Sequence, residues 1–127
     1  MAWTRLPFLL HSLVETGAAF TFTFRPKIQL PGASPETILV LRSYGALLWA
    51  TVFLGGYFGV RNKYDGSSVA FGLSMAFYHV FPIYRAYVRL LSRPGKLGEQ
   101  RVLGGPKVHL LVHLVCLGSL VAAVLGT

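Results

Sequence analysis

Four apolar segments dominate this sequence, and each is close in length to the about 20 residues that an α-helix needs to cross a bilayer. They cover about residues 7–24, 37–60, 67–91 and 109–126. The connectors between them are rich in proline, glycine and charged residues, which do not favour continuation of a helix. The pattern predicts one all-α domain over residues 1–127, an integral membrane four-helix bundle.

The composition agrees with this prediction. Hydrophobic residues make up 54% of the chain and charged residues 13%, against about 25% charged residues in soluble domains. So little polar surface argues against a soluble enzyme, a disordered chain and a disulfide-rich secreted domain. The single cysteine, Cys116, lies in an apolar run and is expected to be a buried thiol. The first segment contains His11 and Glu15 and has no basic cluster before it, which indicates a retained helix rather than a signal peptide.

The net charge of +8 says more about the orientation of the chain in a membrane than about its binding partners. The basic residues flank the apolar segments, so we expect the lipid bilayer as a partner and no nucleic acid. Two connectors, 25–36 and 92–107, share one side of a four-span protein and hold six basic residues, against three on the side of the termini. The six are Arg25, Lys27, Arg93, Lys96, Arg101 and Lys107. For a multi-pass protein, this bias predicts that these connectors face the cytoplasm. The expected location is the endoplasmic reticulum or another internal membrane.

Ionisable side chains inside the predicted spans are the strongest functional signal, because each costs at least about 2.5–3.5 kcal/mol to bury in a bilayer. The ionisable residues are His11, Glu15, Arg42, His79, Arg85, His109 and His113, and Tyr78 lies next to His79 in the sequence. Depths counted at about 1.5 Å per residue put His11, Glu15 and His79 near the midplane. The same count puts Arg42, Arg85 and His113 in a layer nearer the cytoplasmic connectors. We also expect Pro82 to kink its helix beside His79.

Such a set suits acid–base chemistry on a lipophilic small molecule. The candidate catalytic residues are Glu15, His79, Tyr78, His11, Arg42 and Arg85. Glu15 would be a base or an electrostatic anchor, a histidine or Tyr78 would donate a proton, and the arginines would orient Glu15 or a substrate oxygen. The candidate substrate-binding residues are Tyr44, Trp49, Phe53, Phe81 and His113, of which the aromatic ones could stabilise a cation. Epoxide opening, double-bond isomerisation and cation cyclisation all fit these roles.

Other interpretations stay open at this point. Glu15 and Arg42 could simply pair to hold two helices, which would suit a non-enzymatic membrane subunit or assembly factor. Gly55 and Gly59 form a GxxxG motif for packing inside the bundle or for a homodimer. We predict no metal ion and no cofactor. His109 and His113 have metal-ligand spacing, but their predicted depths differ from that of Glu15. His11 and His79 form a lone pair without other haem signals.

Four short runs carry a resemblance to known proteins. They are LLHSLVET from Leu9, LRSYG from Leu41, AFYHVFP from Ala76 with Arg85, and GPKVH from Gly105 with His113. Together they resemble small four-span fungal membrane proteins, some of which are similar to epoxide hydrolases or cyclases encoded beside polyketide synthases. The resemblance covers most of the chain and implies hydrolysis or cyclisation of a polyketide epoxide in an internal membrane.

A second similarity is to sterol-isomerase-type membrane proteins. These also place a histidine and a glutamate four residues apart on a helix, as His11 and Glu15 are here. The similarity implies a sterol or terpenoid isomerase or cyclase. This chain differs from that group because its predicted spans contain a single acid.

Overall fold

A computed structural model describes residues 2–92 and 104–126 of the chain. All regular structure in these two ranges is helical, which confirms the all-α prediction. The elements are η1 (Ala2–Arg5), α1 (Leu6–Phe24), α2 (Pro26–Gln29), α3 (Pro35–Val60), α4 (Gly66–Leu91) and α5 (Gly105–Leu125). The four long helices correspond to the four predicted segments. The short helices η1 and α2 were not predicted.

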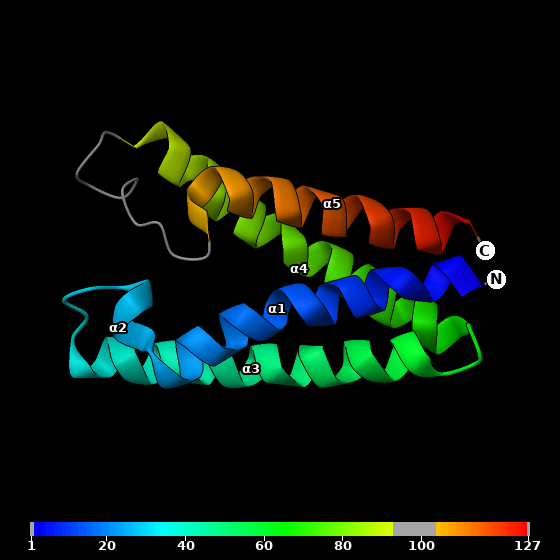
Figure 1. Ribbon diagram of the computed structural model, residues 1–127, viewed down its shortest axis with the longest axis horizontal. Helices are drawn as coiled ribbons and strands as arrows, with labels where there is room; N and C mark the ends of the chain where they lie inside the picture. The colour runs from blue at the N-terminus through cyan, green and yellow to red at the C-terminus, as the bar shows by residue number, and fades with distance from the viewer. Residues whose placement is uncertain (1, 93–103, 127) are drawn as a thin grey trace.

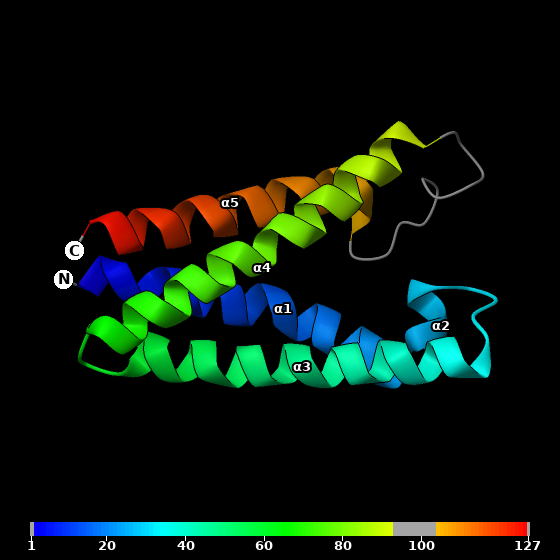
Figure 2. The ribbon, with the colours of Figure 1, turned by 180° about the vertical axis from the view of Figure 1, so that it is seen from behind.

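The long helices form two antiparallel hairpins, α1 with α3 and α4 with α5, and both chain ends lie at the same end of the molecule (Figure 1). The hairpins lie close together at that end and spread apart toward the end that carries α2 (Figure 1). Figure 2 shows that α4 crosses the molecule diagonally rather than parallel to α3. The helix continues through the buried Pro82. Near the middle of α1, side chains of the two hairpins are in hydrogen-bonding contact.

Local sequence sets where the helices begin. Ser34 caps α3, with its hydroxyl accepting the backbone N–H of Thr37 at 3.2 Å, and Pro35 occupies the first turn, where a missing N–H costs little. Asp65 caps α4 by accepting the backbone N–H groups of Ser67 and Ser68. Asp65 is the cap because the helix begins at Gly66, one residue before the predicted start.

Glycines on α3 let α1 approach closely. A Cβ atom added at Gly55 would clash with Ser12 Oγ, and one added at Gly59 would clash with the Leu9 side chain. The Ser12 hydroxyl also donates a hydrogen bond to the Val52 carbonyl at 2.9 Å. The Gly55 and Gly59 surface is thus buried within the chain, and a homodimer through the same surface would have to displace α1.

Two apolar clusters lie along α1. Phe8 packs with Met75, Ala76 and Leu120 toward the end of the molecule that carries the termini. A second cluster is made by Ala18, Ala19, Phe22 and Leu48. His11 and Glu15 fall between the two clusters along the helix. Cys116 is fully buried, as expected, and is a free thiol.

Two of the helices, α3 and α5, are long and apolar enough to cross a membrane. Their most apolar stretches are only 17% and 22% buried, which is low for the core helices of a soluble protein. For α1 and α4 the membrane crossing stays a prediction. Three of the basic residues used for the topology, Arg93, Lys96 and Arg101, lie outside the described residues.

Candidate functional site

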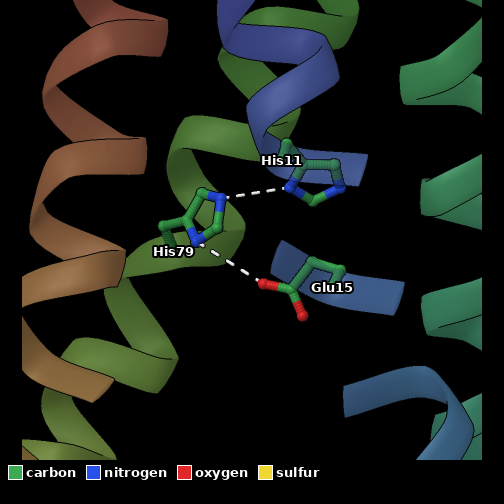
Figure 3. A group of neighbouring side chains, drawn as sticks. All are labelled: His11, Glu15 and His79. Atoms are coloured by element: carbon green, nitrogen blue, oxygen red, sulfur yellow. Dashed lines mark hydrogen bonds and ion pairs between the residues drawn. The ribbon is translucent and has the colours of Figure 1, made fainter. Parts of the chain in front are cut away.

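A buried group of ionisable side chains joins the two hairpins. His11 and Glu15 come from α1, His79 from α4 and His113 from α5. Their exposed fractions are 0%, 1%, 0% and 4%. Figure 3 shows His79 pointing from α4 into the space between His11 and the carboxylate of Glu15. The two residues on α1 point the same way because they are four residues apart on a helix.

The three imidazoles form a continuous chain. His11 Nδ1 lies 3.1 Å from His79 Nε2, and His79 Nδ1 lies 2.8 Å from His113 Nδ1. Each contact requires one nitrogen to carry the proton and the other to accept it. The carboxylate lies at the end of this chain, with Glu15 Oε1 at 3.9 Å from His79 Nδ1 and 3.6 Å from His113 Nδ1.

The two oxygens of Glu15 have different surroundings. The Tyr78 hydroxyl donates to Oε2 at 3.0 Å, and the hydroxyls of Tyr78 and Tyr44 lie 3.3 Å apart. Oε1 is buried and has no hydrogen-bond partner, and the same holds for His11 Nε2. Buried polar atoms are nearly always hydrogen-bonded, so an unpartnered carboxylate oxygen marks this position as a candidate functional site.

A cavity of about 190 Å³ lies beside the carboxylate, between α1 and α5. Its polar lining residues are Glu15, His109 and His113. The apolar lining residues are Val14, Ala18, Val108 and Val112. The sequence analysis did not single out these four residues, although the spacings from Val14 to Ala18 and from Val108 to Val112 place each pair on one helix face.

The two arginines of the predicted catalytic set lie in different places. Arg85 is half-buried, its guanidinium lies 3.1 Å from His109 Nε2, and it has an electrostatic interaction with Glu15. Arg42 is exposed and lines a separate surface pocket near α2, with Phe24, Lys27 and Ile38 among its neighbours. The structure therefore brings Arg85, but not Arg42, toward the carboxylate.

The predicted substrate-binding aromatic residues also separate. Tyr44 reaches Tyr78 and through it the carboxylate. Trp49 is half-buried and stacks on Phe53, which is 68% exposed. Phe81 is 58% exposed and, with Tyr44 and Arg85, lines another pocket of about 320 Å³. None of Trp49, Phe53 and Phe81 lines the cavity beside Glu15.

His113 is the residue whose predicted position changes most. The sequence analysis counted its depth from His109, but α5 begins at Gly105. Counted from Gly105, His113 lies about 12 Å along its helix, and Glu15 lies about 13 Å from Phe24 at the end of α1. The two side chains are therefore at similar depth, and the argument that separated His113 from Glu15 was wrong.

Comparison of the chain with protein-family profiles, with curated protein sequences and with solved structures finds no match. A function for this chain has to be inferred from the geometry of its own residues.

Proposed function

We propose that all four long helices cross the bilayer, so that the protein is a four-span integral membrane protein. At about 1.5 Å per residue, even the shortest of them, α1 with 19 residues, is about 28 Å long, close to the hydrocarbon thickness of about 30 Å. Large apolar side chains are exposed on all four, among them Leu13, Phe53, Phe77 and Leu111. Lipid would cover these side chains, and the ionisable group would lie in the bundle interior, where such residues are found in membrane proteins.

We further propose that the protein is an intramembrane acid–base enzyme that acts on a lipophilic small molecule. The observation that carries this proposal is the cavity, whose wall is apolar except where Glu15, His109 and His113 reach it. Apolar walls with a few convergent polar groups are typical of small-molecule sites. With about 190 Å³, the cavity suits the reacting end of a molecule whose remainder lies in the lipid.

Epoxide opening is the reaction that we favour, in agreement with the resemblance of the sequence. In hydrolysis, the oxygen of a water molecule attacks an epoxide carbon while Glu15 takes a proton from the water. The carbon–oxygen bond of the ring breaks, and protonated His113 gives its proton to the leaving oxygen. The product is a diol, and transfer of the proton from Glu15 to His113, 3.6 Å away, restores both groups. An internal hydroxyl in place of water would give a cyclic ether.

The remaining polar residues would support these two. Tyr78 holds one carboxylate oxygen in place, which leaves the other oxygen directed at His113. Arg85 contacts His109 at the cavity and would orient that ring toward the substrate oxygen. His11 and His79 do not line the cavity, so their effect on the reaction would pass through Glu15 and His113.

The experiment is an assay of the full chain in liposomes with a long-chain terminal epoxide, with the diol measured by mass spectrometry. We expect turnover by the wild-type chain and a loss of at least about 100-fold in Glu15→Gln and His113→Ala, the range for removal of a general acid or base. Phe53→Ala is the matched control, because Phe53 is exposed away from the cavity. Full activity of Glu15→Gln at normal protein level would overturn the proposal. A lower protein level with no turnover in any variant would favour a membrane subunit.

A further inference from the structure

The unpartnered oxygen of Glu15 belongs to a compact set of three possible metal ligands. The pairs formed by Glu15 Oε1, His79 Nδ1 and His113 Nδ1 are separated by 2.8, 3.6 and 3.9 Å. Ligand atoms held at about 2.0–2.2 Å by a tetrahedral metal ion are about 3.3–3.6 Å from one another. The three atoms therefore surround a point where an ion could bind after small side-chain movements.

The burial of the group supports a ligand at this point. The exposed fraction of Glu15 is 1%, and its Oε1 atom has no hydrogen-bond partner. A buried carboxylate oxygen without a partner is costly, since the desolvation of a charged group is not offset. A divalent cation would satisfy Oε1, while Tyr78 already satisfies Oε2.

A fourth residue, His11, is not one of the three ligands but orients one of them, His79. His11 Nδ1 lies 3.1 Å from His79 Nε2, and His11, Glu15 and His79 each offer a ligand atom within 4.8 Å of the others. If His79 carries its proton on Nε2 and donates it to His11, the lone pair of His79 Nδ1 faces Glu15 and His113. Histidines that bind metals usually donate their second N–H to such an outer partner.

From this geometry we propose that Glu15, His79 and His113 bind a divalent transition-metal ion, with His11 as the positioning residue behind His79. Two histidines and one carboxylate are the donors of many catalytic zinc sites and of non-haem iron sites, whereas Mg²⁺ and Ca²⁺ prefer oxygen ligands alone. Glu15 and His113 also line the cavity, so a further coordination position would face it. When bound, the ion would supply a Lewis acid beside the cavity. The inference does not rest on the proposed reaction, and the two describe alternative states of the site, because a chain that holds the ion on Glu15 and His113 does not use these groups as a free base and a protonated acid.

The test is the metal content of the full chain, purified in detergent with an affinity tag that contains no histidine. After loading with Zn²⁺ and desalting, mass spectrometry of the metal should give about one Zn²⁺ per wild-type chain, as for a single three-ligand site. Glu15→Gln, His79→Ala and His113→Ala should each lower the Zn²⁺ content at least tenfold. His109→Ala is the matched control, because His109 packs on the His113 ring, with centroids 4.9 Å apart, and contacts Arg85 but is not one of the three ligands, and it should keep its Zn²⁺.

Two further measurements distinguish loss of the metal site from misfolding of the variants. X-ray absorption of the Zn²⁺-loaded wild type should show nitrogen and oxygen neighbours at about 2.0–2.1 Å with imidazole scattering. His11→Ala should keep the ion but bind it about 10–100-fold more weakly, as expected for loss of an outer partner. Wild-type protein without retained Zn²⁺, or ligand variants that retain as much as His109→Ala, would overturn the site. Epoxide turnover by metal-free wild-type chain would leave the proposed function standing without it.

Discussion

The Tyr78 hydroxyl donates a hydrogen bond to Glu15 Oε2 at 3.0 Å and thereby links α4 to α1 across the two hairpins. We predict that Tyr78→Phe lowers the free energy of unfolding in detergent by about 1–3 kcal/mol, because the second carboxylate oxygen then also loses its partner. Thermal unfolding followed by circular dichroism measures this effect. Glu15→Gln in the Tyr78→Phe background should cost less than in the wild type, since the two residues share one interaction.

Tyr84→Phe is the control for this prediction. Tyr84 lies on the same helix and is 66% exposed, so loss of its hydroxyl should change the stability by less than about 0.5 kcal/mol. Equal effects of Tyr78→Phe and Tyr84→Phe would show that the bond to Glu15 does not hold the hairpins together.

The contact of Gly55 with α1 gives a second prediction. Gly55→Ala should destabilise the protein by about 1–3 kcal/mol, the usual cost of overpacking, because the new methyl group meets Ser12 Oγ and the Phe8 carbonyl oxygen. The neighbouring Gly56 has open space around its Cβ position. Gly56→Ala should therefore be neutral or stabilising by up to about 1 kcal/mol, through better helix propensity.

The Gly55→Ala variant also bears on oligomerisation. Light scattering in detergent should give the same mass for Gly55→Ala and the wild type if this surface packs only within the chain. A wild-type dimer that dissociates in Gly55→Ala while the helix content and the melting temperature stay unchanged would instead assign the glycines to a homodimer.

Asp65 predicts a pH dependence of stability. The backbone N–H of Ser68, followed by Arg61 and Lys63, holds the pKa of Asp65 below its usual value. A carboxyl group whose folded pKa is depressed contributes stability above its unfolded pKa of about 3.9 and loses it as the pH falls through the folded value. We therefore expect the melting temperature to fall as the pH drops below about 5, in part through this group.

Asp65→Asn separates this group from the others. Asparagine still accepts hydrogen bonds at a helix N-cap but does not titrate, so the variant should melt lower than the wild type at pH 7 and show a shallower decrease toward acid. Identical acid profiles of the two proteins would mean that Asp65 contributes nothing to the pH dependence.

Much of the site was visible in the sequence because helix periodicity is a local property. The spacing of His11 and Glu15 predicted a common face, and the structure buries both. The contact between Glu15 and His113 was missed because it depends on where α5 begins and on how the helices cross. Arg42 was assigned to the site by its depth and by an inward face that it was predicted to share with Gly45 and Trp49, whereas α3 buries the face of Gly45, Leu48, Val52, Gly55 and Gly59. Arg42 is exposed because the close approach of α1 to Gly55 and Gly59 turns a different side of α3 toward the interior.

The cavity beside Glu15 gives a last prediction. Val112 lines this cavity from α5, whereas the preceding residue, Leu111, is 64% exposed. Val112→Trp should fill the space where the substrate binds and lower epoxide turnover in liposomes by about tenfold or more, since small displacements from a reactive geometry are costly. Leu111→Trp should leave turnover unchanged. Both variants should retain as much Zn²⁺ as the wild type, so that a loss of turnover reports on the cavity and not on the metal ligands. Normal turnover of a folded Val112→Trp variant would place the reaction elsewhere in the protein.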